Sequence, residues 1–217
     1  MRSIQQSNQK SCCLSSSIEN ISPVKKDYSC TNESNLYTVN NYTDYYSFKK
    51  TAKLVKQIID QLINDKKNNS NNNYNHDNSS NNKNNFYKLF DCNLFYNTSF
   101  TKYITNILRT FKVQKHIVLG SLILIDKFCN NNPEFAVTKV NRCLLFLASL
   151  IISMKVQDDI VYDDKSYSLG SGVELAWLVL IESGFLYGIN YNSFINHEAF
   201  FEYSYSFDLL YNDSKNC

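Results

Sequence analysis

The side chains that could take part in catalysis or metal binding are those of one Cys, two His and two pairs of Asp. Cys143, His116 and His197 carry the groups of a thiol nucleophile and its base, but no third orienting group or Gly-rich turn accompanies them. The acidic pairs 158–159 and 163–164 offer carboxylates to a divalent cation, although adjacent carboxylates on a loop are more often simply solvated. We therefore predict no catalytic residue, no metal site and no cofactor. A small helical enzyme is the least favoured interpretation.

The seven Cys form neither a metal-binding nor a disulfide pattern. The sequence has no C-x-x-C pair and no two His at ligand spacing, which disfavours zinc. An odd number of scattered Cys indicates free thiols in a reducing compartment, and Cys143, inside an apolar run, is typical of a small core residue. The first ten residues contain no apolar stretch, and the longest apolar runs are shorter than the roughly 20 residues of a membrane span. We expect an intracellular protein of the nucleus or cytoplasm, with no membrane partner.

Two isolated charges have a different character, because each stands on an otherwise apolar stretch. Lys155 is the first charge after the apolar run 143–154, and Glu182 is the only charge between Leu175 and Phe185. A lone charge on an apolar element usually has a specific partner. For Lys155 the alternative is a side chain that extends along the helix end into solvent.

The composition favours helices as the elements that position these residues. Among 217 residues there are only 5 Gly and 2 Pro, fewer than the tight turns of β-sandwiches or doubly wound folds require. The net charge is +2 and no basic run is dense, so nucleic acid is not an implied partner. With 43% hydrophobic residues and a mean hydropathy of −0.36, the polar residues must be concentrated in particular segments.

Three segments, two of them strongly polar, precede the expected folded body. Residues 1–40 are rich in Ser, Asn and Gln, and we predict a disordered tail. Residues 41–66 contain an amphipathic pattern that predicts a helix from about Asp44 to Asp65. Residues 67–85 form an Asn-rich, low-complexity loop, because eleven of the eighteen residues from Asn68 to Asn85 are Asn.

Residues 86–212 are predicted to form a five-helix bundle. The expected helices span about 98–110, 114–130, 138–156, 173–187 and 193–209. The third helix contains the segment CLLFLASLIISM, which is apolar all round and is typical of a helix buried by neighbours on every side. Short strands stay open for the β-branched pieces of the second and third helices, although the uninterrupted length of both argues against them. The predicted fold class is all-α, with an extra N-terminal helix beside the bundle.

The order of these elements resembles the cyclin box, and within the cyclins the P/U-type, phosphate-pathway-like subfamily. That subfamily reads approximately Y-L-x-R-I, L-x-Y-x-D-R, F-x-L-T-x-x-N, A-S-K-F-x-D-D, G-G-I-x and L-E-x-x-F-L. The corresponding fragments here are YITNI (103–107), LILIDKF (122–128), FAVTKVN (135–141), ISMKVQDD (152–159), GSGVEL (170–175) and LIESGFL (180–186). The match needs no gap from Thr138 to Leu186, and it covers a little under half of the chain.

The resemblance implies a regulatory protein without an active site. Cyclins bind the mobile αC helix of a cyclin-dependent kinase and move it so that the catalytic groups of the kinase come into register. The family's main polar contacts, a Lys near the end of the third helix and a Glu in the fourth, fall on Lys155 and Glu182. Leu144 and Phe185 are expected to add apolar contacts to the kinase. The implied assembly is a heterodimer with a cyclin-dependent protein kinase.

The departures from the family pattern concern structural positions. The Arg of Y-L-x-R-I is Asn106 here, with Arg109 the nearest cation, so an ion pair from the first helix to Asp126 is lost or rerouted. Asp126 is expected to be a structural tether, and D-R of the family is Asp126-Lys127. The family's G-G is Ser171-Gly172. These departures indicate a divergent member.

Two further expectations accompany the resemblance. Ser22 begins a Ser-Pro-Val-Lys stretch that matches the proline-directed, basic-at-plus-three site of cyclin-dependent kinases, and it is a candidate phosphorylation site. The competing function is a cyclin-fold interaction module, of a transcription-factor or scaffold type, that does not activate a kinase. The Lys155 and Glu182 pair discriminates between the two, because only kinase binding requires it.

Overall fold

A computed structural model describes residues 47–69, 86–91, 95, 98–159 and 161–213. Over these residues the chain is helical, with no strand. The helices are α2 (Phe48–Asn69), the 3-10 helix η1 (Phe86–Leu89), α3 (Phe100–Thr110), α4 (Lys115–Asn131), α5 (Arg142–Gln157), α6 (Asp164–Ser171), α7 (Leu175–Gly188) and α8 (His197–Asp213). The predicted all-α fold, a bundle around a central apolar helix with an extra N-terminal helix, is confirmed. The predicted tail 1–40, with Ser22, lies outside the described residues.

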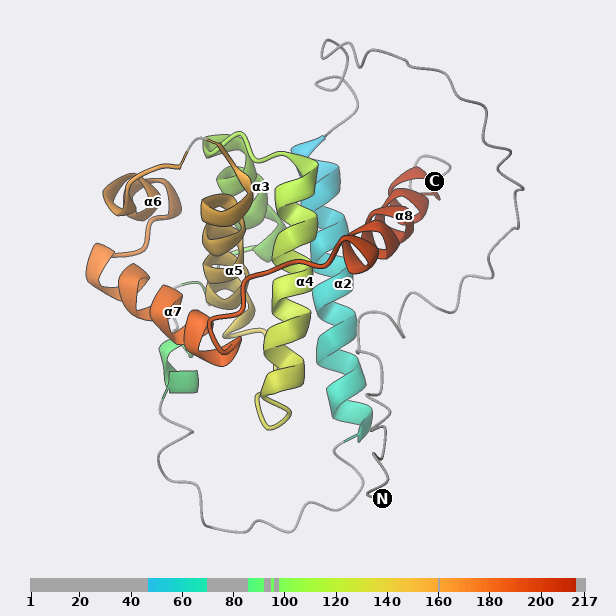
Figure 1. Ribbon diagram of the computed structural model, residues 1–217, viewed down its shortest axis with the longest axis horizontal. Coiled ribbons are helices and arrows are strands. Elements are labelled where there is room, and N and C mark those ends of the chain that lie inside the picture. The colour runs from blue at the N-terminus through green and yellow to red at the C-terminus, as the bar shows by residue number, and fades with distance from the viewer. Residues whose placement is uncertain (1–46, 70–85, 92–94, 96–97, 160, 214–217) are drawn as a thin grey trace, which may run out of the picture.

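Helix α5 is the centre of the bundle. Every residue from Cys143 to Met154 is buried, and α5 packs against α4, α7 and α3 (Figure 1). Such burial is what an all-round apolar helix requires, since each fully buried Leu or Ile contributes about 1.5–3 kcal/mol. The buried hydroxyl of Ser153 donates to the Ile117 carbonyl at 2.7 Å, so the polar atom inside this apolar contact has a partner.

A reciprocal cap precedes α5. The Thr138 hydroxyl accepts from the N–H of Asn141 at 3.3 Å, and the Asn141 side chain accepts from the N–H of Thr138 at 2.8 Å. The helix begins at Arg142, four residues after its predicted start at residue 138. Thr138 therefore caps the turn through which the chain enters the helix.

Helix α2 packs against α3 and α8, and α8 packs against α4, on the side of the bundle away from α6 and α7 (Figure 1). Helix α2 buries a stripe that includes Val55, Ile59 and Leu62, as its amphipathic pattern predicts. The N–H of Ser47 donates to the Tyr211 hydroxyl at 2.9 Å, so the two helices are joined where α2 begins and α8 ends. Helix α2 continues to Asn69, beyond its predicted end near Asp65, and residues 70–85 of the predicted Asn-rich loop lie outside the described residues.

Helix α6 is absent from the sequence prediction. The Asp163 carboxylate accepts from the N–H of Ser166 at 2.8 Å and caps its start, and Gly172, with φ 71°, ends it in the left-handed conformation. Helices α6 and α7 meet at 104°. Within the described residues no single helix is long and apolar enough to cross a membrane; only this sharply bent pair, taken together, has the length and composition.

Candidate protein-interaction site

Lys155 and Glu182 form an ion pair between the central helix and α7. Lys155 lies in the last turn of α5, and its Nζ is 2.7 Å from Oε1 and 2.9 Å from Oε2 of Glu182. The Lys155 side chain is 27% exposed and that of Glu182 is 15% exposed, so the pair lies at the rim of the core. The sequence singled out both residues, and the structure places them on the same face.

A third residue, Asp164, completes the cluster. Its Oδ1 is 2.8 Å from the Lys155 Nζ, and its side chain is 46% exposed. An ammonium has three N–H donors. The two oxygens of Glu182 and one of Asp164 therefore use all the donors of Lys155 within the chain.

The surroundings of Lys155 keep it charged. Burial lowers its pKa, but hydrogen bonds and charge attraction from Asp164 and Glu182 outweigh that effect, so its pKa is raised overall. The buried ring of Tyr167 lies beneath the ammonium, with its centroid 5.7 Å from Nζ. The cluster is thus a fixed charged group, and its pKa is not tuned toward proton transfer near neutral pH.

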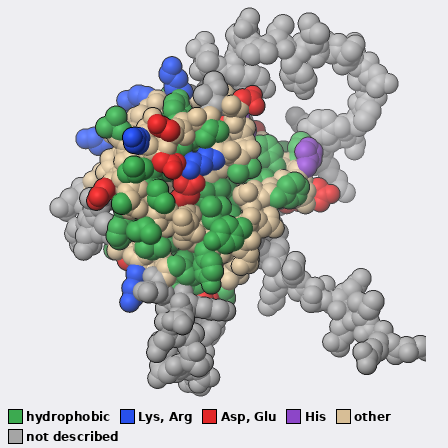
Figure 2. Space-filling model, turned by 60° about the vertical axis from the view of Figure 1, so that its left-hand side comes forward, with side chains coloured by type: hydrophobic (Ala, Val, Ile, Leu, Met, Phe, Trp, Pro, Cys, Tyr) green, Lys and Arg blue, Asp and Glu red, His purple; other side chains and the backbone are tan. Residues whose placement is uncertain are grey.

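Exposed apolar side chains lie on the same helix as Glu182. Figure 2 shows acidic and basic side chains set among hydrophobic ones on the face of α6 and α7. Helix α7 turns Leu178, Ile181 and Phe185 into the core, whereas Val179 and Leu180 on its other side are 43% and 48% exposed. Exposed apolar residues beside a polar centre are typical of a protein-interaction surface. We name this surface, defined by Lys155, Asp164, Val179, Leu180 and Glu182, the α5–α7 face.

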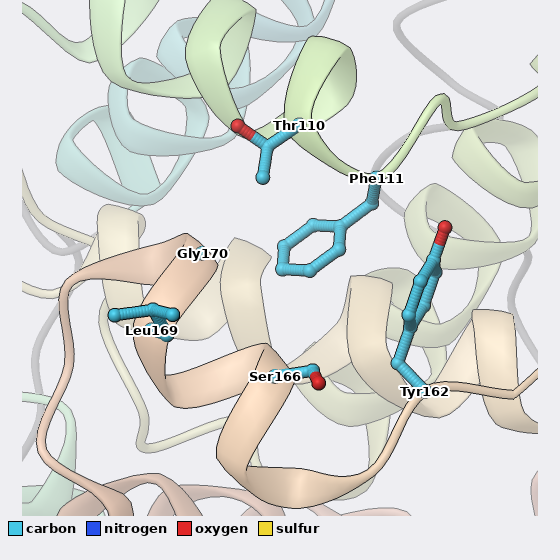
Figure 3. Close-up of a pocket in the computed structure, with 6 residues that line it drawn as sticks. All are labelled: Thr110, Phe111, Tyr162, Ser166, Leu169 and Gly170. Atoms are coloured by element: carbon cyan, nitrogen blue, oxygen red, sulfur yellow. The ribbon is translucent and has the colours of Figure 1, made fainter.

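A hollow with a volume of about 460 Å³ lies between the end of α3 and α6 (Figure 3). Its lining residues are Thr110, Phe111, Tyr162, Ser166, Leu169 and Gly170. The Phe111 ring points into it, Tyr162 lies beside that ring with 5.5 Å between the centroids, and Leu169, on the opposite side, is 88% exposed. These lining residues include no acid–base pair and no activated nucleophile, so the hollow offers a surface for contact and no catalytic arrangement.

The structure corrects two predicted contact residues. Leu144 and Phe185 are both 0% exposed, and the Phe185 ring stacks on Phe128 with 4.9 Å between ring centroids. Both side chains belong to the core and cannot contact a partner in this conformation. The large apolar side chains that α7 exposes are those of Val179, Leu180 and Tyr187.

Asp126 and Lys127 hold the C-terminal part of the fold against α4. Asp126 is 5% exposed, and its Oδ2 accepts from the Tyr203 hydroxyl of α8 at 2.6 Å. The Lys127 Nζ donates to the carbonyl oxygens of Asn192 and Phe194, at 3.0 and 2.7 Å. Asp126 thus has the position of a structural tether.

Asn106 and Cys143 do not belong to the cluster of Lys155, Glu182 and Asp164. Asn106 is exposed on α3 and makes no pair with the buried Asp126. Cys143 is 3% exposed, and burial raises its pKa to about 11, although the nearby Arg142 acts in the opposite direction. A buried thiol of this pKa is no nucleophile at neutral pH.

Three of the four residues in the acidic pairs have structural roles. Asp158 ends α5, Asp163 caps α6, and Asp164 binds Lys155, so the second pair is not the solvated loop that the sequence suggested. Sequence reasoning missed Asp164 as a member of the Lys155 cluster. The signal was the N-cap pattern of an Asp three residues before Ser166, which marks a helix start at this point.

The described residues form an all-helical bundle around a buried apolar helix, with an ion pair at the rim of the core. The cyclin family model matches residues 49–193, which is about two thirds of the chain. The chain belongs to the cyclin family, whose members are regulatory proteins and not enzymes themselves.

Curated relatives point to one branch of that family. Cyclin-U2-2 of Arabidopsis thaliana is 25% identical over 116 residues, which cover 54% of this chain and 50% of that protein. Cyclin-P4-1 of Oryza sativa subsp. japonica is 27% identical over 101 residues, 46% of this chain and 48% of that protein. The chain spans about half the length of the curated relatives it matches. It is a divergent cyclin similar to the plant U- and P-types.

Proposed function

We propose that this cyclin is the regulatory subunit of a cyclin-dependent protein kinase, and that it activates the kinase by positioning its αC helix. The α5–α7 face is the proposed docking surface. The observation that carries the proposal is the Lys155–Glu182 pair, which offers a cation and an anion side by side among exposed apolar residues.

The chemistry of the pair suits the ends of a helix. Backbone carbonyls at a helix C-terminus accept from an ammonium, and unpaired backbone N–H groups donate to a carboxylate. The exposed Val179 and Leu180 would cover the apolar side of the same helix. Polar contacts that fix register inside an apolar surround are the usual composition of a specific interface.

The test begins with purification of the tagged chain from its native cells and measurement of protein kinase activity in the recovered complex. The informative variant is Lys155→Met/Glu182→Met. Removing both partners leaves no poorly hydrated charge unpaired, and Asp164, which is 46% exposed, regains water when Lys155 is lost, so the fold is expected to remain stable. Kinase activation should fall by at least about 30-fold, because loss of desolvated charge contacts costs on the order of 2–5 kcal/mol.

The matched control removes a different ion pair, on the other side of the bundle. The Lys115 Nζ of α4 lies 2.5 Å from Oδ1 of Asp208 of α8. The variant Lys115→Met/Asp208→Met should leave kinase activation unchanged. Undiminished activation in the Lys155/Glu182 variant would show that the docking contacts are wrong. Recovery of scaffold or DNA-bound proteins without any kinase would replace the proposal with that of an interaction module.

A further inference from the structure

Lys155 and Glu182 differ in the hydrogen-bonding capacity that each has left for a partner. All three N–H groups of the ammonium are bonded within the chain, to both oxygens of Glu182 and to one oxygen of Asp164. Each carboxylate oxygen has two acceptor sites. Glu182 can therefore accept a further N–H without giving up Lys155, whereas Lys155 can donate to a partner only after it releases one of its present acceptors.

Asp164 is the acceptor that is released at the lower cost. Its side chain is 46% exposed, against 15% for Glu182, so its carboxylate regains water when the bond to Lys155 breaks. Glu182 would be left as a poorly hydrated charge on an apolar helix, which is far less favourable. Asp164 also lies on α6, a separate eight-residue helix, whereas Glu182 lies on α7, which packs directly on the central helix.

We infer that Asp164 competes within the chain for the Lys155 ammonium and thereby lowers the affinity of the α5–α7 face for its kinase. This inference rests on the proposed function. Asp164 and Glu182 contact the same ammonium, yet they act on binding with opposite signs. Glu182 holds Lys155 in place and itself contacts the partner, while Asp164 must let go for the partner to bind.

The experiment measures the affinity of three full-length variants for the kinase that co-purifies with the wild-type chain. Asp164→Asn removes the charge of the competing acceptor. It should tighten binding about two- to five-fold, the size expected for a partly exposed ion pair that no longer has to break. Glu182→Gln should weaken binding by about tenfold or more, since it removes a charged acceptor from the interface.

Asp163→Asn is the control, because it makes the same change in net charge one residue away. Asp163 caps α6 and makes no contact with Lys155 within the described residues, and Asn caps a helix as well as Asp does. Its affinity should equal that of the wild type. Thermal unfolding of all three variants verifies that each is folded.

The outcomes separate this inference from the function on which it rests. Suppose that a kinase binds the wild type, and that Asp164→Asn leaves its affinity unchanged or weakens it. That result overturns the inference and leaves the proposed function intact. Equal tightening in Asp164→Asn and Asp163→Asn would reveal a general charge effect and also overturn it. Absence of any kinase bound to the wild type would remove both.

Discussion

At the scale of single residues, the ion pair of Lys155 and Glu182 joins the last turn of the central helix to α7. Lys155 and Glu182 could be found because a charge inside an apolar run needs a reason, and the structure joins them at 2.7 Å. Asp164 could not be assigned to them, because its approach to Lys155 depends on the path of the chain after α5. Leu144 and Phe185 were misplaced for a related reason: a helix that is apolar all round carries no pattern to show which side is buried.

The Asp126–Tyr203 hydrogen bond gives a prediction at this scale. Tyr203→Phe removes a buried donor at 2.6 Å from the carboxylate and should lower the free energy of unfolding by about 1–3 kcal/mol. Urea unfolding followed by circular dichroism measures the change. Tyr205→Phe, on the same helix but 49% exposed, should change stability by less than about 0.5 kcal/mol. Equal effects of the two substitutions would mean that Asp126 is no tether.

Contacts between helices depend on small residues as much as on large ones. Helix α7 approaches α4 where Gly188 faces the ring of Phe128, and a Cβ at Gly188 would lie 2.2 Å from Phe128 Cε2. That ring is fully buried and stacked on Phe185, so it has no room to move. At Gly184 a Cβ would meet the tip of Leu89 at 2.9 Å, which is a flexible side-chain end. The sequence shows both Gly but not which of them faces an immobile ring.

Gly188→Ala should therefore destabilise the protein by about 1–2 kcal/mol, because forcing the Phe128 ring aside costs more than the gain in helix propensity. Gly184→Ala should be neutral within about 0.5 kcal/mol, since Leu89 can rotate away while the helix gains propensity. Thermal melts of the two variants beside the wild type give the comparison. A larger loss at Gly184 than at Gly188 would contradict this account of the α4–α7 contact.

The described helices share one hydrophobic core, and α8 belongs to it. Its side chains Tyr203, Phe207 and Tyr211 are buried with those of the bundle, although the family match ends at residue 193. The sequence predicted this helix from its aromatic residues and predicted the central position of α5 from its apolar run. It did not predict α6, whose eight mostly polar residues show no apolar stripe, so the Asp163 cap was the one signal of this helix. The fold was thus predictable where buried helices show an apolar pattern in the sequence. The site was predictable only where a charged residue interrupts such an apolar pattern.

A chain that ends at Asn196 should lose stability by more than about 3 kcal/mol, because the three buried aromatic residues of α8 each contribute about 1.5–3 kcal/mol. It would also uncover Asp126. Thermal unfolding and size-exclusion chromatography should show a lower midpoint and aggregation. The full-length Phe201→Ser variant, changed at a side chain that is 68% exposed, is the control and should behave as the wild type. A monomeric truncated chain with an unchanged midpoint would show that α8 is an accessory element.

The hydrogen bond between Ser47 and Tyr211 brings the two ends of the described fold together. Segments that continue the chain past either end of it must leave from one corner, on the α2 and α8 side, opposite α6 and α7 (Figure 1). A fluorescent protein or an affinity tag fused directly before residue 47 or after residue 213 would start from that corner, away from the α5–α7 face. A short linker from residue 211 to residue 47 would likewise permit a circularly permuted chain, with new ends placed between α2 and η1.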